Sequence, residues 1–285
     1  MSRVLVIGAT GTVGRQVVSQ LLARGTPVRA MVRNPLSAAL PPQVEVRQGD
    51  LTIPETLVNC LDGIDTVFLV WVAPPDTAAP VVEHISRRAR RIVLLSSPYK
   101  TPHPFFQQPN RLRLFHAQLE QLVEASGMEW TFLRPGIFAA NARLWWAPQI
   151  RSGDVVRWPY AAAATAPIHE SDIAAVAVRV LTEQGHAGAE YVLTGPESST
   201  QAEQVSTIGR ALGRNLRYEE ISPEQARREL LLIIPAPPII EMLLNAWGAA
   251  IDQPAFITSR VADLTGFEPR TFFEWSIDHA LDFRC

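Results

Sequence analysis

The sequence predicts an α/β fold, a doubly wound parallel sheet to which a smaller, mainly helical C-terminal lobe is attached. First, apolar strands alternate with helical segments over roughly the first half of the 285 residues, the pattern of a parallel sheet covered by helices on both faces. Second, the first strand runs through three glycines directly into a helix. We expect residues 1–150 to form the sheet domain and residues 151–285 the smaller lobe, with some elements of the two interleaved.

The turn after the first strand has the features of a dinucleotide-binding loop. Residues 4–7 are apolar, Gly8, Gly11 and Gly14 follow, and the helix that starts at once is closed by Gly25. The first glycine permits a tight turn, the second lets backbone N–H groups approach a pyrophosphate, and the third lets the helix pack on the strand. The residues expected to hold the pyrophosphate are Gly8, Thr10, Gly11, Thr12, Val13 and Gly14.

The second and third strands are expected at residues 28–32 and 44–46. Arg33 follows the second strand, where such folds contact the adenosine ribose, and a guanidinium there suits the 2′-phosphate of NADP. The alternative for Arg33 is a solvated surface arginine. Asp50 follows the third strand and is either an adenine contact or the cap of a helix that begins near Pro54.

Two further strands are expected at residues 65–72 and 91–95. The first is almost continuously apolar, which indicates burial on both faces, and the small Ala73 after it leaves room for a ligand. The arginines of the segment 87–91 are interpreted as a solvated helix end. Ser97, after the second of these strands, either orients a carbonyl or ribose hydroxyl or satisfies backbone groups in its loop.

A helix from about residue 110 to Gly127 carries His116, with Glu120 one turn later, and a strand follows at residues 130–133. Doubly wound folds bind their ligands at the carboxyl ends of strands. The stretches that lie at such ends are the segment 8–14, Arg33, Asp50, Ala73, Ser97 and the segment 135–138. The residues expected to shape the nicotinamide site are Trp71, Ala73, Pro135, Gly136, Ile137 and Phe138.

Regular alternation weakens after Phe138. Residues 161–166 are interpreted as a linker, Ser171 or Asp172 as the N-cap of a helix over 173–181, and residues 190–193 as a strand. Helices are expected at about 200–212, 222–232, 239–250 and 271–283. Aromatic side chains gather in this half, and we expect one or two to line an apolar cleft for a flat substrate, the others being core: Phe138, Trp145, Trp146, Trp158, Tyr160 and Trp247.

Composition excludes several classes of protein. A net charge of −2, without a run of like charges, argues against nucleic acid as a partner. The longest apolar run near the C-terminus is broken by prolines, so no membrane span is expected. Two distant cysteines, no metal-ligand spacing and no signal peptide favour a reduced, cytoplasmic protein without a metal. The apolar helix pair over 222–250 is either a lid or a subunit interface, so a homodimer is possible.

The motifs together resemble the atypical short-chain dehydrogenases of the NmrA-like group, over nearly the whole chain and least over residues 222–262. The resemblance implies a Rossmann domain that binds NAD(P), a smaller lobe that binds the substrate, and a possible place in secondary metabolism. It also implies site roles for Leu51, Ser96 and Asn141. The residues that carry it are the segment 8–14, Arg33, the segment 49–51, Ser96, Ser97, the segments 120–127 and 131–136, Phe138, Asn141 and the segment 169–173.

One departure from that family concerns the catalytic pair. Ordinary short-chain dehydrogenases use Tyr-x-x-x-Lys, and the matching positions here are Leu112 and His116. Either His116 contacts the nicotinamide ribose or serves as the acid–base group, or the substrate needs no protein acid, or the protein binds NADP(H) without turnover. A further alternative is a structural His116 near the surface, paired with Glu120.

The resulting first hypothesis is an NADPH-dependent oxidoreductase acting on an aromatic, quinone-like or unsaturated small molecule, with His116 and Ser97 as candidate catalytic residues. The second is a non-catalytic, NADP(H)-sensing regulatory protein of the NmrA type. A sugar-nucleotide epimerase is a third hypothesis, disfavoured by the missing tyrosine and lysine.

Overall fold

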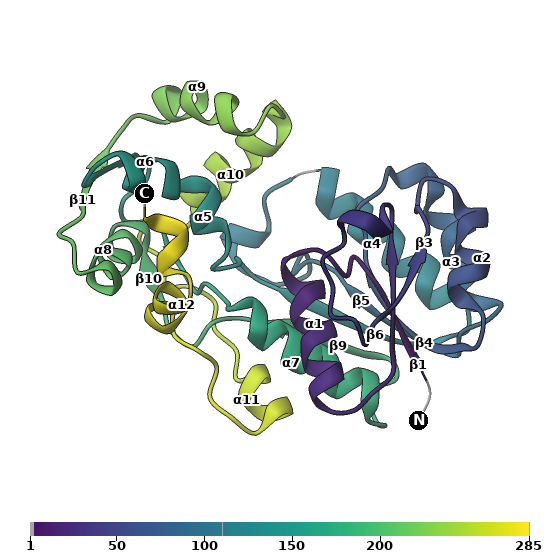
Figure 1. The fold of residues 1–285 in the computed structure, drawn as a ribbon. Helices are drawn as coiled ribbons and strands as arrows, with labels where there is room; N and C mark the ends of the chain where they lie inside the picture. Colours follow the sequence, from purple (N-terminus) through teal and green to yellow (C-terminus); the bar gives the residue numbers. More distant parts are fainter. Residues whose placement is uncertain (1–2, 110, 285) are drawn as a thin grey trace.

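A seven-stranded sheet lies at the centre of the larger domain of the computed structural model, which describes residues 3–109 and 111–284 (Figure 1). The strand order is β3-β2-β1-β4-β5-β6-β9 and every ladder is parallel. This arrangement confirms the predicted doubly wound sheet. Its strands are β1 (Arg3–Ile7), β2 (Val28–Val32), β3 (Glu45–Gln48), β4 (Ile64–Val70), β5 (Arg91–Leu95), β6 (Glu129–Pro135) and β9 (Ala189–Leu193).

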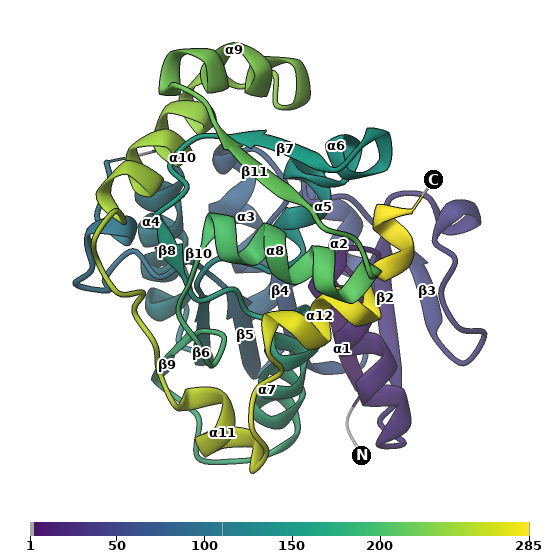
Figure 2. The ribbon, with the colours of Figure 1, turned by 90° about the vertical axis from the view of Figure 1, so that its left-hand side faces the viewer.

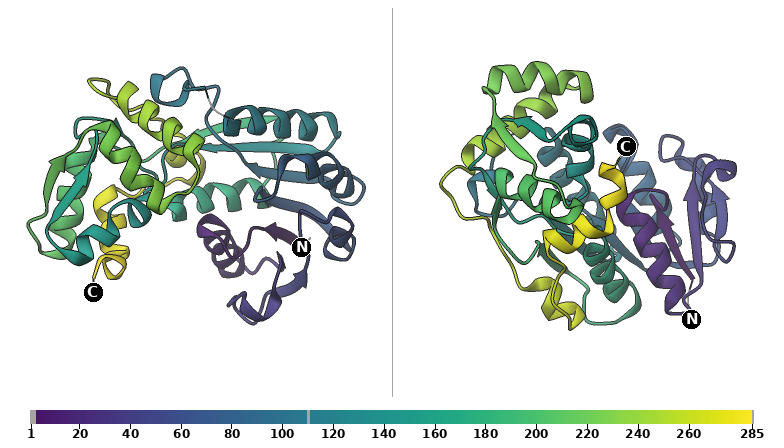
Figure 3. Two further views of the ribbon diagram at one scale, coloured as in Figure 1. Left: turned by 90° about the horizontal axis from the view of Figure 1, so that it is seen from above. Right: turned by 60° about the vertical axis from the view of Figure 1, so that its left-hand side comes forward.

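Helices cover both faces of this sheet (Figure 3). The α1 (Thr12–Ala23), α7 (Glu170–Thr182) and α11 (Arg260–Thr265) helices lie on one face, and α2 (Leu57–Leu61), α3 (Ala78–Ser86) and α4 (Arg111–Ala125) on the other. Strand β4 is apolar from Val67 to Val70 because its side chains pack on both faces of the sheet. Its Phe68 packs into the core beneath α1 and α7, while Val67 and Leu69 pack into the core beneath α2, α3 and α4.

The smaller lobe, which faces the viewer in Figure 2, has a hydrophobic core of its own. Residue 150, the boundary expected from the sequence, falls inside α6, and the chain returns to the sheet with α7 and β9 before it re-enters the lobe. The lobe contains α5 (Asn141–Trp145), α6 (Ala147–Ser152), β7 (Val155–Trp158), β8 (Ala164–Thr165), β10 (Ser199–Thr200), α8 (Gln201–Leu212), β11 (Arg217–Glu220), α9 (Pro223–Ile233), α10 (Pro237–Ala249) and α12 (Phe272–Asp278).

Short 3₁₀ turns complete the described part of the chain. Four of the five turns found there begin with a proline, which suits the first position of such a turn. They are η1 (Pro35–Ser37), η2 (Pro54–Thr56), η3 (Pro75–Thr77), η4 (Pro104–Phe106) and η5 (Ala280–Phe283). No helix within the described ranges is both long and apolar enough to cross a lipid bilayer.

Two local predictions are wrong. Residues 161–166 are not a linker, because β8 pairs antiparallel with β10 and Ala163 is fully buried. Helix α7 is capped by His169, whose Nδ1 accepts a hydrogen bond from the Ser171 N–H at 3.0 Å. Asp172 is engaged elsewhere, since its carboxylate accepts from the Arg270 N–H at 2.7 Å.

Candidate functional site

The glycine turn after β1 is shaped to receive an anionic group. Gly8 has a φ of +86°, a conformation that favours glycine, and a Cβ on Gly14 would lie 2.0 Å from the Gly8 carbonyl oxygen. Helix α1 therefore packs closely on the strand only because position 14 has no side chain. Gly11 is the N-cap of α1 and no side chain of a described residue caps it. The first-turn N–H groups of α1 are thus placed to bind a pyrophosphate.

Arg15, which sequence reasoning missed, holds this turn in place. Its Nε donates to the Thr10 carbonyl oxygen at 2.9 Å, and its two terminal nitrogens donate to the Ala39 and Ala38 carbonyl oxygens at 3.1 and 3.2 Å. One guanidinium therefore connects the glycine turn to the loop after β2. No local pattern indicates this role, because the two loops are more than 20 residues apart in the sequence.

Arg33 lies exposed just beyond β2, and its guanidinium makes no hydrogen bond or ion pair with a described residue. Asp50 follows β3, and its Oδ1 accepts from the Thr52 N–H at 2.9 Å and from the Thr52 hydroxyl at 2.8 Å. These hydrogen bonds, with a smaller contribution from Arg33, lower the pKa of the Asp50 carboxyl. The cap alternative for Asp50 is wrong, since η2 follows Ile53 without a side-chain cap. The predicted adenine contact stays open, whereas the Leu51 side chain is buried in the core.

A cavity of about 340 Å³ lies at the carboxyl ends of β5 and β6. One wall comes from the sheet domain, and the facing wall comes from α10 of the small lobe, which lies on the side toward the sheet (Figure 1). The structure brings together eight of the residues singled out in the sequence: Ser96, Ser97, His116, Pro135, Gly136, Ile137, Phe138 and Asn141. Lining residues that the sequence did not indicate include Tyr99, Phe105, Phe106, Arg113, Met242 and Leu243.

His116 reaches this cavity from α4. Its Nδ1 is buried and has no hydrogen-bond partner among the residues described. Burial lowers the pKa of the His116 imidazole, and the partly opposing effect of the Glu120 charge is smaller. The imidazole is therefore neutral near pH 7. The alternative of a surface histidine paired with Glu120 is wrong. Among the described residues, the hydrogen bonds that the Glu120 carboxylate accepts come from Ser96, Tyr99 and Arg134, and not from the imidazole. Leu112 lies one turn earlier in α4.

The Glu120 carboxylate organises the floor of the cavity. It accepts hydrogen bonds from the Ser96 hydroxyl at 2.6 Å, the Tyr99 hydroxyl at 2.5 Å and the Arg134 Nε at 2.9 Å. Arg134 also pairs with Glu190. Burial, reinforced by the neighbouring carboxylate, raises the pKa of Tyr99, so the phenol keeps its proton. The network ties the loop after β5 to β6 and so fixes the shape of the cavity.

Ser97 lines the cavity half-buried, and within the described residues its hydroxyl makes no hydrogen bond. The alternative of a purely backbone-satisfying serine therefore has no support in the structure. Trp71 and Ala73 lie together beyond β4, where the indole N–H donates to the Ala73 carbonyl oxygen at 2.5 Å. Neither of them lines the cavity, and their contact with the nicotinamide stays a prediction.

The tryptophans belong to the core of the small lobe. Of the six aromatic residues from which one or two were expected to line the cleft, Phe138 lines the cavity and the tryptophans do not. Trp145, Trp146, Trp158 and Trp247 are at most 6% exposed and pack against one another, as in the edge-on pair of Trp145 and Trp247 with ring centroids 5.2 Å apart. None of them lines the cavity, and neither does Tyr160. The four indoles come from distant segments and pack against one another, and phenylalanines line the cavity instead.

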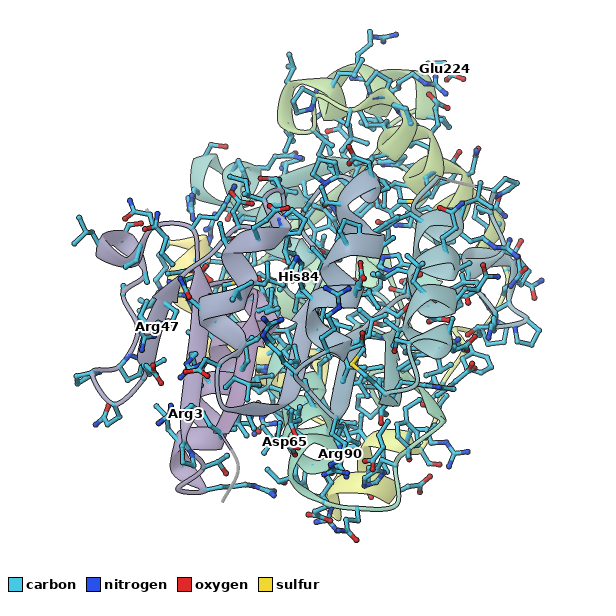
Figure 4. All side chains as sticks on the ribbon, turned by 90° about the vertical axis from the view of Figure 1, so that its right-hand side faces the viewer. Arg3, Arg47, Asp65, His84, Arg90 and Glu224 are labelled. Atoms are coloured by element: carbon cyan, nitrogen blue, oxygen red, sulfur yellow. The ribbon has the colours of Figure 1, made fainter. Side chains whose placement is uncertain are left out.

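The opposite edge of the sheet is built differently (Figure 4). Asp65 and Arg90 lie there, with Arg90 paired to Asp65 at 3.4 Å and to Glu129 at 2.5 Å. A polar cavity of about 390 Å³ at this edge is lined by paired arginines such as Arg90 and Arg91. The glycine turn and the apolar cavity both lie at the carboxyl edge, which is therefore the candidate site.

Comparison with known proteins adds three findings. The NAD(P)H-binding family model matches residues 8–184. The (4-alkanoyl-5-oxo-2,5-dihydrofuran-3-yl)methyl phosphate reductase of Streptomyces griseus is 39% identical over 98% of this chain and 99% of its own, and the NAD(P)H azoreductase of Xenophilus azovorans is 32% identical over 98% and 99%. The crystal structure of an NADPH-dependent quinone oxidoreductase from Escherichia coli superposes with a TM-score of 0.79 at 25% identity, covering 98% of this chain and 99% of the other.

Proposed function

Because this chain belongs to the NAD(P)H-binding family and is an NAD(P)H-dependent oxidoreductase, we propose that it reduces small, flat, conjugated acceptors such as quinones, with NADPH as the preferred donor. The observation that carries the proposal is the apolar cavity at the carboxyl ends of β5 and β6. It lies on the sheet edge that also carries the glycine turn, as a substrate next to a bound nicotinamide requires.

The lining of the cavity supports this class of acceptor. The rings of Phe105, Phe106 and Phe138 contribute to its walls, and aromatic rings favour flat ligands that stack or meet them edge-on. The named relatives act on an oxo-dihydrofuran, an azo compound or a quinone. Each of these compounds contains a double bond that is polarised by, or formed between, electronegative atoms, and such a bond is a good acceptor of reducing equivalents.

In this proposal, different residues bind the cofactor, orient the acceptor and exclude water. The turn over 8–14 would bind the pyrophosphate, and Arg33 would bind the 2′-phosphate. A bound reduced nicotinamide supplies the hydride. Neutral His116 would donate a hydrogen bond to the acceptor oxygen as negative charge develops there, and Ser97 would orient the same oxygen. The apolar walls would exclude water during the transfer.

The cavity also bears on the sensing alternative. A protein that only senses NADP(H) needs no second ligand, whereas about 340 Å³ of apolar space is the size of a small-molecule site. The epimerase alternative has no tyrosine at the expected position of α4, and Tyr99 is held by Glu120. A cytoplasmic location and a homodimer formed through α9 and α10 stay predictions, of which the second is testable by sedimentation.

The direct test is to mix the purified protein with NADPH and 1,4-naphthoquinone or an azo dye, and to follow the loss of reduced-nicotinamide absorbance. We expect turnover with at least one acceptor. His116→Ala should lower kcat about 10-fold or more, since a hydrogen bond to developing charge is lost, while the Kd for NADPH stays within about twofold. NADPH binding without oxidation in the presence of either acceptor would contradict the proposal and favour the sensor.

A further inference from the structure

We propose that Arg113 binds an oxyanion of the substrate, so that the preferred acceptors carry a carboxylate, sulfonate or phosphate beside the reducible group. The inference rests on the proposed function, because it defines the substrate class of the same cavity. Arg113 reaches that cavity from α4.

The charge balance of the cavity favours an anion. Among the described residues that line it, Arg113 is the one whose side chain is charged at neutral pH. His116 is neutral because burial lowers its pKa, Tyr99 keeps its proton, and no lining residue is an aspartate or glutamate. Apolar walls, here including Met242 and Leu243, reduce solvent screening, so an oxyanion is attracted more strongly than at an open surface.

The carboxylate behind the cavity does not change this balance. Glu120 is 1% exposed, and the positive charge of Arg134 balances its negative charge. Two nitrogens of the Arg134 guanidinium, Nε and Nη2, donate hydrogen bonds to the Glu120 carboxylate. The second carboxylate on Arg134 belongs to Glu190, which also pairs with Lys100 at 2.9 Å. These four side chains carry two positive and two negative charges, so the network contributes no net charge behind the site.

The guanidinium of Arg113 is held in a defined place. Its Nη1 donates to the Gln107 carbonyl oxygen at 3.2 Å, in the loop that forms one wall of the cavity. A planar group with five N–H donors matches the oxygens of a carboxylate, sulfonate or phosphate, and it can do so alongside a backbone contact. Arg113 therefore has the geometry to orient a substrate as well as to attract it.

The spacing on α4 defines the substrate further. Arg113 and His116 are three residues apart and share a helix face, about 4.5 Å apart along the axis. When the oxyanion of a substrate is bound at Arg113, a reducible group a few bonds away on the same substrate lies beside His116. A quinone ring that carries a sulfonate or carboxylate has its carbonyl oxygens within this reach, whereas a neutral quinone lacks the group that would fix its orientation.

The test compares 1,4-naphthoquinone-2-sulfonate with neutral 2-methyl-1,4-naphthoquinone in the wild-type protein and in Arg113→Gln. The ratio of the two kcat/KM values cancels any general loss of activity. We expect the ratio of sulfonate to neutral quinone to fall about 10- to 100-fold in Arg113→Gln, as for loss of a charge-assisted hydrogen bond, and Arg113→Lys to recover part of it. Arg88→Gln, an exposed site in the turn after α3, should keep the ratio.

A binding measurement separates this inference from the proposed function. In the presence of NADP⁺, 2-naphthalenesulfonate should bind the wild-type protein more tightly than 2-naphthalenemethanol, and Arg113→Gln should abolish that preference. If the neutral quinone is reduced but neither the ratio nor the preference responds to Arg113→Gln, the anion site is overturned while the reductase stands. If the preference depends on Arg113 but no quinone is reduced, the reductase fails while the anion site stands.

Discussion

Glu120 and Arg134 form a buried ion pair directly behind the cavity at the carboxyl ends of β5 and β6, with the Arg134 Nε 2.9 Å from Glu120 Oε1 and both side chains at most 2% exposed. Glu120 lies on α4 and Arg134 on β6, so the pair joins a helix to the strand beneath it. Because the same carboxylate accepts from Ser96 and Tyr99, the pair also fixes the first residues of the loop after β5. This ion pair therefore holds Ser96 and Tyr99, which line the cavity, in position.

Replacing this carboxylate should therefore cost stability. In Glu120→Gln the buried guanidinium of Arg134 loses its main counter-charge, and we expect the free energy of unfolding to fall by about 3 kcal/mol. Urea denaturation followed by far-UV circular dichroism measures this. Glu124→Gln, an exposed position one turn further along α4, is the matched control and should change stability by less than about 0.5 kcal/mol. Equal effects of the two substitutions would contradict the structural role of the pair.

Arg33 should determine the choice between the two nicotinamide cofactors. Arg33→Ala removes the cation placed for the 2′-phosphate, so the Kd for NADPH should rise about 10- to 100-fold while that for NADH changes little. Titration of nicotinamide fluorescence measures both constants. Arg47→Ala, at an exposed arginine of the neighbouring strand β3, should leave the NADPH preference in place. A similar loss of affinity for both cofactors would rule out the 2′-phosphate assignment.

The close approach at Gly14 gives a test of the glycine turn. A methyl group there would lie 2.0 Å from the Gly8 carbonyl oxygen, so Gly14→Ala must push α1 away from the strand. We expect NADPH binding to weaken at least tenfold and the thermal midpoint to fall by several degrees. Gly153→Ala is the control, because a Cβ at that position meets no heavy atom within 4 Å. Normal NADPH affinity in Gly14→Ala would contradict the assignment.

His116 should make stability depend on pH in a defined direction. Burial lowers its pKa in the folded state below that of the unfolded chain, so the unfolded state takes up its proton first on acidification. Stability contributed by this group is present above the unfolded pKa of about 6.5 and falls as the pH decreases below it. Denaturation at pH 7.5 and 5.5 should therefore show a smaller loss for His116→Gln than for the wild type. Identical losses would show that the imidazole is not desolvated.

The dinucleotide-binding half of the fold could be predicted because its signals are local. A buried strand is recognised from consecutive apolar residues, as in the segment 67–70, and a helix from apolar positions three and four residues apart. The glycine turn at 8–14 is likewise contained within seven residues. The same reasoning could not find β8 or the cap at His169, since alanines give no periodic signal and a histidine is not an expected cap.

The sequence by itself thus determined the doubly wound sheet, the glycine turn after its first strand, and the positions of Ser97 just after β5 and of His116 on α4. Only the tertiary structure decided which side chains line the cavity. Arg113 and Leu243 face the same space although 130 positions separate them, whereas Trp247, one turn beyond Leu243 on α10, points into the core. The reason is physical: periodicity reports which residues share a face, but packing between distant segments determines whether that face meets solvent, core or ligand.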